Sequence, residues 1–247
     1  MILVTGPTGS GKTTTLYSVL GELNNPEYNI VTVEDPIEYQ VPGINQVAVK
    51  SEIGLTFGES LRSILRQDPD IVMIGEIRDN ETADIAVKAA LTGHQVLSTL
   101  HTNDAAGAIS RLDDMGIEPF LIASSCILTC AQRLVRRLCV NCKEEYLPEM
   151  ELLESLGIAD QQGVHFYRGA GCERCKKRGY SGRAAVIEVL PVTETIRRLI
   201  IKRASANVIK NQAVAEGMKT LRVVGIDKAR EGITSLEEVL RLTSDDH

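Results

Sequence analysis

Short apolar runs alternate with helix-period segments over the first 130 residues of the chain. The β-rich runs are residues 2–5, 30–33, 44–49, 71–74 and 96–100. Patterns typical of helices lie between and after them, at residues 13–23, 57–66, 82–91 and 105–115. Near-continuous apolar strands are typical of a parallel sheet that helices cover on both faces. The pattern therefore predicts an α/β, doubly wound core.

The character of the sequence changes near Arg133, beyond which paired cysteines and glycines show little periodicity. A helical pattern returns after Val192, where Thr193 can cap an apolar stripe and Ser235-x-x-Glu238 has the spacing of a capping box. We expect three parts: a core of residues 1–135, a small module of residues 136–183 and a C-terminal helical region of residues 184–247.

The most apolar stretch is residues 120–131, which Ser124, Ser125 and Thr129 interrupt. It is too short to span a bilayer, so we interpret it as a buried helix. Cys126 and Cys130 would lie one turn apart on this helix, as small buried hydrophobic side chains rather than ligands.

Residues 6–13 read Gly-Pro-Thr-Gly-Ser-Gly-Lys-Thr and match the phosphate-loop pattern G-x-x-x-x-G-K-[ST] at every position. Glycines let successive backbone N–H groups face phosphates, and the following helix adds its partial positive charge. We expect Lys12 to reach the β- and γ-phosphates of ATP and the Thr13 hydroxyl to hold Mg²⁺. The expected nucleotide-binding residues are Gly6, Pro7, Thr8, Gly9, Ser10, Gly11, Lys12, Thr13 and Thr14.

Carboxylates follow two of the expected strands, at the sheet edge where ligands bind in such folds. Glu34, Asp35 and Glu38 follow the second strand, and Glu76 follows the fourth. A nucleotide hydrolase needs one carboxylate near its metal and one to orient or deprotonate the attacking water. The two clusters supply candidates for both roles. The alternatives are solvated loop carboxylates and, for Glu34 and Asp35, a structural role in the turn.

Gly75 occupies the position that is commonly aspartate in a Walker B motif, so only Glu76 remains there. Glu76 can bind Mg²⁺ through water, because that ion keeps several of its waters.

His94 and His101 flank the expected strand of residues 95–100 and are seven positions apart, which separates them by roughly 20 Å. They cannot share a metal ion. His101 follows the strand on the nucleotide side, where it is a candidate sensor of the γ-phosphate or of a neighbouring subunit. His94 is expected at the opposite edge. A structural role is the alternative for each histidine.

Two C-x-x-C knuckles, formed by Cys139 with Cys142 and by Cys172 with Cys175, are separated by 29 residues. Four thiolates complete a tetrahedral site of the kind that Zn²⁺ prefers, and they leave no position open for catalysis. The zinc site is therefore expected to be structural. A redox role for a single C-x-x-C is the alternative, against which the second copy counts.

The amino-acid composition and net charge limit the functional classes to which the protein can belong. The chain is 43% hydrophobic and 24% charged, as is ordinary for a soluble globular protein. A formal net charge of −6 argues against general electrostatic binding to nucleic acid. The glycine-rich loop begins at Gly6 and leaves no room for a signal peptide, so we expect a cytoplasmic protein with a further N-terminal region missing from the sequence.

Taken together, these motifs resemble the GspE/PilB/PilT family of secretion ATPases, and the resemblance covers nearly the whole chain. It rests on GPTGSGKTTTLYSVL, VEDPIEYQVPGINQVAV, LRSILRQDPDIVMIGEIRDNETADIAVKAALTGH, STLHTNDA and GIEPFLIASS…AQRLVRRLC. By this resemblance the core is RecA-like, Glu38 is the catalytic base and Glu76 the Mg²⁺-associated carboxylate. His101 would couple nucleotide state to subunit contacts. The cysteines and GITSLEEVLRL look like the extension branch, GspE and PilB, rather than the retraction branch, PilT.

The resemblance also implies partners. Members of the family work as homo-hexamers on the cytoplasmic side of the inner membrane, which they reach through platform and assembly proteins. Their ATP turnover drives pilin or pseudopilin assembly, with no direct contact to nucleic acid expected. The family's N-terminal domain, which supplies arginines in trans, is not in this sequence.

Two other classes remain open: a RecA-like DNA translocase, helicase or DNA-uptake motor, and a nucleotide-dependent scaffold without hydrolysis. The acidic charge and an aromatic content of 4% count against stacking on single-stranded DNA. The presence of both Glu38 and Glu76 counts against the scaffold.

Overall fold

The computed structural model describes residues 1–158 and 165–243. Its regular elements are, in chain order, β1 (Ile2–Thr5), α1 (Lys12–Leu23), β2 (Ile30–Glu34), β3 (Asn45–Ala48), η1 (Ser51–Ile53), α2 (Phe57–Ile64), η2 (Leu65–Gln67), β4 (Ile71–Ile74), α3 (Asn80–Leu91), β5 (Gln95–Leu100), α4 (Ala105–Asp114), α5 (Pro119–Ser125), β6 (Leu128–Leu138), β7 (Lys143–Tyr146), α6 (Met150–Ser155), β8 (Phe166–Gly169), η3 (Glu173–Cys175), β9 (Tyr180–Pro191), α7 (Glu194–Ile201), α8 (Ala206–Ala215), α9 (Leu221–Arg230) and α10 (Leu236–Thr243).

The chain forms two compact units. Unit 1 comprises Met1–Ala131 and Val189–Met218. Unit 2 comprises Gln132–Glu188 and the chain from Lys219 onward, as far as it is described. The long strands β6 and β9 each run from one unit into the other.

The main sheet has the strand order β3-β2-β4-β5-β1-β6-β9. The five pairings from β3 to β6 are all parallel, as in Ile2 with Leu97 and with Leu128. Every residue of β2 and β4 is buried, which explains why β4 reads as a continuous apolar run and why β2 is apolar except for Thr32 and Glu34. The predicted α/β core with a parallel sheet is confirmed.

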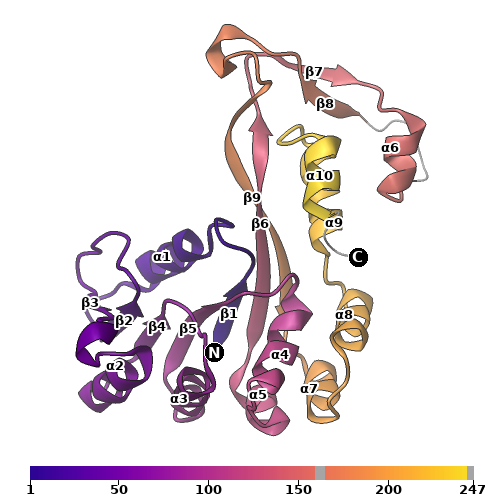
Figure 1. The fold of residues 1–247 in the computed structure, drawn as a ribbon. Helices are drawn as coiled ribbons and strands as arrows, with labels where there is room; N and C mark the ends of the chain where they lie inside the picture. Colours follow the sequence, from indigo (N-terminus) through magenta and orange to yellow (C-terminus); the bar gives the residue numbers. More distant parts are fainter. Residues whose placement is uncertain (159–164, 244–247) are drawn as a thin grey trace. The chain divides into compact units, whose positions relative to one another are not determined.

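Helices cover both faces of this sheet in unit 1. On one face, Leu16, Tyr17 and Leu20 of α1 pack against strand residues that include Val4 and Met73. Helices α2, α3 and α4 contact β2, β5 and β1 respectively, and Figure 1 shows α2 and α3 across the strands from α1. The carboxyl ends of the strands are left for loops, and these loops carry the candidate site.

The prediction of one helix over residues 120–131 was wrong. Helix α5 ends at Ser125, and β6 begins three residues later. Cys130 lies on β6 opposite Val4 of β1, so pairing with an unfilled sheet edge overrides the local pattern. Cys126 is fully buried as predicted, and burial raises the pKa of both thiols to about 11.

Unit 2 has its own hydrophobic core. Leu153 and Phe166, from the segment around α6 and β8, pack with Ile226, Leu236 and Val239 of α9 and α10. Strands β7 and β8 pair antiparallel, with Tyr146 opposite Phe166. The core of this unit therefore combines two segments that lie far apart in the sequence.

A buried carboxylate supports the same unit. Glu238 is 1% exposed, and its oxygens accept hydrogen bonds from the backbone and guanidinium of Arg136 and from Arg241, at 2.8–3.1 Å. Burial alone would raise the pKa of Glu238, but these donors outweigh it and lower the pKa to about 2. The predicted cap at Ser235 forms in part: its hydroxyl accepts from the Glu238 N–H at 3.4 Å, while the Glu238 side chain binds the arginines.

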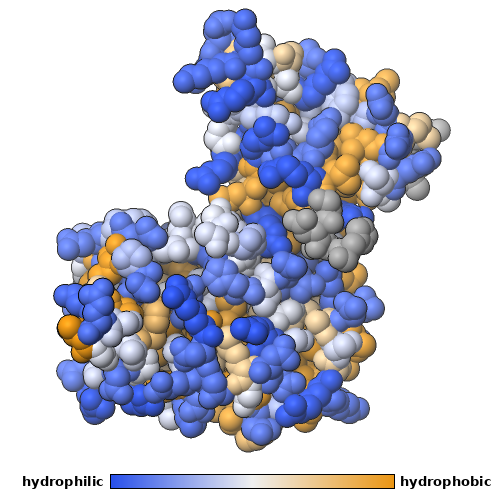
Figure 2. Space-filling view, in the orientation of Figure 1, coloured by the Kyte–Doolittle hydropathy of each residue, from blue (hydrophilic) through white to orange (hydrophobic). Residues whose placement is uncertain are grey.

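Hydrophilic side chains dominate the visible surface, with hydrophobic ones in smaller patches between them (Figure 2). Among the described residues, no helix has the length and apolar character that crossing a lipid bilayer requires.

Candidate functional site

The phosphate-loop sequence forms the connection between β1 and α1, as its motif predicts. Gly9 and Gly11 have positive φ angles of 79° and 86°, and α1 begins directly after Gly11, at Lys12. Glycine adopts this left-handed conformation without the steric cost that a Cβ would add. The loop can therefore turn its backbone toward a ligand at the first turn of α1.

The Lys12 ammonium folds over this loop. It is largely buried and donates hydrogen bonds to the carbonyl oxygens of Gly6, at 2.8 Å, and Pro7, at 3.2 Å. Thr13 and Thr14 are exposed on the first turn of the helix. No acidic side chain lies in that turn, unlike the first turns of α2 and α3, which carry Glu59 and Glu81. The helix end keeps its positive character, so the loop fits a nucleotide polyphosphate, and the hydroxyl oxygen of Thr13 fits a Mg²⁺ ion bound to it.

Glu34 ends β2 as a buried, fully engaged carboxylate. It accepts hydrogen bonds from the Tyr17 hydroxyl, from Thr32 Oγ1 at 2.6 Å and from Gln46 Nε2 at 3.1 Å. The structure thus places Glu34 in a structural network, one of the two readings open from sequence. Tyr17 and Gln46 belong to no motif that would mark them as part of the site from the sequence alone.

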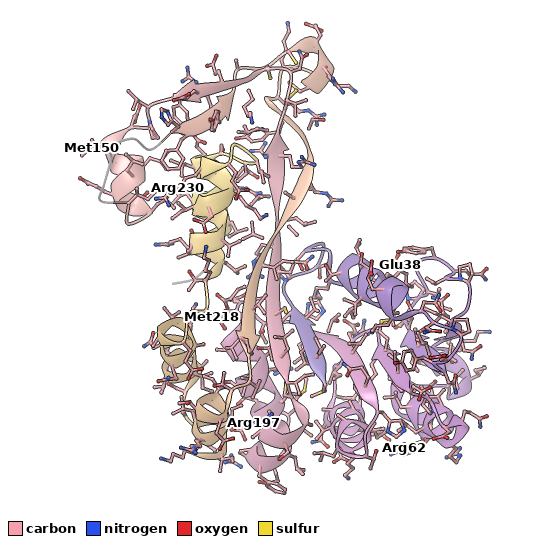
Figure 3. All side chains as sticks on the ribbon, turned by 180° about the vertical axis from the view of Figure 1, so that it is seen from behind. Glu38, Arg62, Met150, Arg197, Met218 and Arg230 are labelled. Carbon is pink, nitrogen blue, oxygen red and sulfur yellow. The ribbon has the colours of Figure 1, made fainter. Side chains whose placement is uncertain are left out.

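Glu38 lies in the loop that follows β2, and its side chain is exposed. Its backbone N–H donates to the Tyr17 hydroxyl at 3.3 Å. Figure 3 shows the residue beside helix α1, whose first turn carries Lys12 and Thr13. The candidate base is therefore next to the helix of the phosphate loop, with its carboxylate free to face solvent or substrate.

Glu76 is the centre of a charged cluster beyond β4. Its carboxylate binds the guanidinium of Arg78 on one oxygen and Nε2 of His101, at 3.0 Å, on the other. Arg78 also lies 3.8 Å from Asp35, beyond β2. The Glu76 side chain is only 16% exposed, whereas those of Arg78 and His101 are 61% and 48% exposed. The cluster joins the ends of three neighbouring strands.

The close packing of position 75 against β2 favours glycine over the usual aspartate. A Cβ atom at this position would lie 3.3 Å from the Val33 carbonyl oxygen and 3.4 Å from Cα of Glu34. Because these are backbone atoms rather than the end of a flexible side chain, a larger residue would require β2 to shift by a few tenths of an ångström. Glu76 is therefore the carboxylate that this strand end can present.

The two histidines lie at opposite ends of β5, as their spacing predicts. His94 Nδ1 lies 3.0 Å from the carbonyl oxygen of Ala89 and 3.1 Å from the Thr92 hydroxyl, which ties the end of α3 to the start of β5. At the other end, the Thr5 hydroxyl bonds Thr102 and the Leu100 carbonyl, and so fixes the segment that carries His101 to β1.

The four knuckle cysteines come together in unit 2. Their sulfur atoms all lie within 4.8 Å of one another, and three of the pairs are 3.8–3.9 Å apart. Zinc–sulfur bonds of about 2.3 Å require sulfur separations of about 3.8 Å in a regular tetrahedron. The geometry fits a Zn²⁺ ion held by Cys139, Cys142, Cys172 and Cys175.

Backbone donors favour negative charge on Sγ of Cys175, one of the four sulfur atoms. Cys175 Sγ accepts from the N–H of Cys172 and from that of Gly179, each at 3.2 Å. The Cys172 N–H is the main cause that lowers the pKa of the Cys175 thiol to about 6. Beside the knuckle, a Cβ at Gly169 would lie 2.1 Å from the Gly179 carbonyl oxygen, so the end of β8 and the segment before β9 approach closely only because both residues are glycine.

A family model described as "Type II/IV secretion system protein" matches residues 1–241. The chain belongs to this family. PilB, the type IV pilus assembly ATPase of Thermus thermophilus, is 56% identical over 245 residues, which are 98% of this chain and 28% of that protein. The type II secretion system ATPase E of Vibrio cholerae is 53% identical over 245 residues, which are 99% of this chain and 48% of that protein. The chain spans less than half the length of either relative.

Solved structures agree with this assignment. The crystal structure of the pilus retraction motor PilT with bound ADP aligns with 98% of this chain and 60% of its own, with a TM-score of 0.71 and 30% identity. The ATPase DotB of Legionella pneumophila aligns with 100% of this chain and 60% of its own, with a TM-score of 0.70 and 26% identity. These findings confirm the predicted P-loop ATPase fold and the resemblance to secretion ATPases.

Proposed function

We propose that this chain is the ATP-hydrolysing core of a motor that powers pilin or pseudopilin assembly, in type IV pilus extension or type II secretion. The observation that supports it most is the grouping of Lys12, Glu38 and the Glu76 cluster at the ligand-binding edge of one parallel sheet. The relatives described above, which are more than half identical, are named as a pilus assembly ATPase and a secretion ATPase, which favours the extension branch.

Hydrolysis requires the oxygen of a water molecule to bond to the γ-phosphorus as the bond from that phosphorus to the β–γ bridging oxygen breaks. We assign the phosphates to the loop of residues 6–14, with Lys12 exchanging the carbonyls of Gly6 and Pro7 for phosphate oxygens. Glu38 accepts the proton of the attacking water. Thr13, directly, and Glu76, through water, would hold Mg²⁺, which supplies charge neutralisation at the phosphates.

The Glu76 cluster is suited to report the nucleotide state. His101 and Arg78 both bind the Glu76 carboxylate, and the His101 side chain is half exposed. A movement of Glu76 would therefore change the position of the exposed imidazole of His101. In a homo-hexamer this would reach the neighbouring subunit, whose N-terminal region would add arginines in trans.

The tetracysteine centre takes a structural role in this proposal. Four thiolates complete the coordination of Zn²⁺, and the cluster belongs to the unit without the phosphate loop. The motor is expected to be cytoplasmic and to reach the inner membrane through platform and assembly proteins, without direct contact to nucleic acid.

Replacing the chromosomal gene by one encoding Glu38→Gln tests the proposal. Loss of surface pili would assign the motor to pilus extension, and loss of exoprotein secretion would assign it to type II secretion. The ATPase rate of the purified chain should rise with the cytoplasmic domain of an inner-membrane platform protein. A rise with single-stranded DNA, and none with the platform domain, would favour a DNA translocase instead.

A further inference from the structure

Tyr17 connects the helix of the phosphate loop to the segment that carries Glu38. It lies on α1 and is 4% exposed, with its ring in the core and its hydroxyl at the strand end. The hydroxyl donates to Glu34 and accepts the backbone N–H of Glu38 at 3.3 Å. One oxygen atom thus links α1, β2 and the loop between β2 and β3.

Gln46, from β3, holds the same loop at two more points. Its Oε1 accepts the N–H of Val41 at 2.8 Å, and its Nε2 donates to the Tyr39 carbonyl at 3.2 Å. The same Nε2 donates to Glu34 at 3.1 Å. The side chains of Tyr17 and Gln46 therefore hold the backbone of residues 38, 39 and 41, and both of them meet at Glu34.

The chemistry of this network suits a fixed support rather than a proton acceptor. Glu34 already accepts three hydrogen bonds and is 2% exposed, so an attacking water has no access to it. Burial and the bond to Glu34 raise the pKa of Tyr17 to about 12, so its hydroxyl remains a donor at neutral pH. The Tyr17 ring also meets the Tyr39 ring edge to face, with centroids 4.4 Å apart.

We propose that Tyr17, Glu34 and Gln46 are positioning residues for hydrolysis, which fix the loop of residues 38–41, and so the Glu38 carboxylate, relative to the phosphate-loop helix. This inference rests on the proposed function of Glu38 as the base. Helix α1 would hold the nucleotide directly and the base through Tyr17. The distance between the nucleotide and the base would therefore stay the same when the helix moves. Misplacing a catalytic group by about 1 Å can cost on the order of 100-fold in rate.

The first experiment removes single polar groups from the full chain. Tyr17→Phe deletes one hydroxyl, and Gln46→Met keeps a side chain of similar length without its amide. Each should lower kcat by about ten- to 100-fold while the affinity for a fluorescent ATP analogue changes less than about twofold. Tyr28→Phe, at an exposed tyrosine between α1 and β2, is the matched control and should leave both unchanged. Equal loss of affinity and kcat in the two network variants would contradict a positioning role.

Hydrogen exchange measures how firmly the backbone of residues 38–41 is held, independently of the ATPase rate. In Tyr17→Phe, the backbone amides of Glu38 and Val41 should exchange faster than in the unmodified chain, while those in the middle of α1 keep their rates. Unchanged exchange at residues 38–41 would overturn the inference, whatever the ATPase rate.

A double-mutant cycle then connects the network to the base. In a Glu38→Gln background, adding Tyr17→Phe should cost no further activity, because the hydroxyl acts through Glu38. An additive loss would show that Tyr17 acts by another route and would contradict the inference. If Glu38→Gln retained full activity, the proposed base itself would be wrong, and the exchange rates alone would decide whether the network holds the loop.

Discussion

Nε2 of His101 lies 3.0 Å from a carboxylate oxygen of Glu76, so the ends of β4 and β5 are joined by their own side chains. We predict that His101→Ala lowers ATP turnover by about tenfold or more, because Glu76 loses one of the two groups that hold it. Nucleotide affinity should remain close to that of the unmodified chain. His94→Ala, at the other end of the same strand, is the control. Equal effects of the two variants on turnover would show that the contact has no special role.

Lys12→Ala should abolish hydrolysis and weaken nucleotide binding strongly, since it removes the ammonium of the phosphate loop. Titration with a fluorescent ATP analogue and a phosphate-release assay measure the two effects. Normal affinity and turnover in this variant would disprove the assignment of residues 6–14 as the phosphate site.

Glu38→Gln should still bind Mg·ATP but lose turnover by about 10²–10⁴-fold, the usual contribution of a general base. Glu76→Gln should change the Mg²⁺ concentration that half-saturates the rate, whereas Glu38→Gln should not. The comparison requires both variants under the same Mg²⁺ titration. A normal rate in Glu38→Gln and none in Glu76→Gln would reverse the two roles.

Purified, reduced protein should contain about one zinc per chain, because a cluster of four thiolates is stable only with a divalent ion. Cys172→Ser should lower the metal content and loosen residues 139–183, while nucleotide binding by unit 1 persists. Elemental analysis measures the first effect and limited proteolysis the second. Cys126→Ser, in a fully buried cysteine outside the cluster, should keep its zinc. Metal-free protein, or loss of zinc only in the Cys126 variant, would contradict the assignment.

Acid should destabilise unit 2 through Glu238. Its pKa falls from about 4.5 in the unfolded chain to about 2 in the folded one, so its stabilising contribution is complete above about pH 4.5. That contribution is lost as the pH falls from 4.5 toward 2. Glu238→Gln should lose about 1.5–3 kcal/mol of stability at pH 7, the range for hydrogen bonds to a charged group. Denaturant melts at several pH values test this, and the variant should show a weaker dependence on pH below 4.5 than the unmodified chain.

The first five strands and four helices were predictable because local signals agree with the fold there. The phosphate-loop pattern marks the end of β1 and the start of α1 almost to the residue. Strand β4 is apolar throughout because both of its faces are covered. Glu76 and His101 were expected at the same sheet edge, and the structure brings them into contact. Their chemical roles remain predictions.

Other parts depend on partners that a local pattern does not reveal. Strand β6 carries Arg133 at a half-buried position and Arg136 and Arg137 at exposed ones. It is a strand because it pairs with β1. Tyr17 reads as one more apolar residue of α1, because the partner of its hydroxyl, Glu34, is 17 residues away. Long-range contacts of this kind decide both the strand and the network around Glu38.

The two segments that form the core of unit 2 are synthesised at different times during translation. Phe166 packs with Leu236, which leaves the ribosome about 70 residues later, or several seconds later at about 5–20 residues per second. All four cysteines proposed to bind zinc have been synthesised by Cys175. The proposed metal centre would therefore assemble on the nascent chain before Leu153 and Phe166 meet α9 and α10. A truncation that removes these two helices would leave the cysteines in place but expose Leu153 and Phe166, a surface that chaperones and proteases recognise.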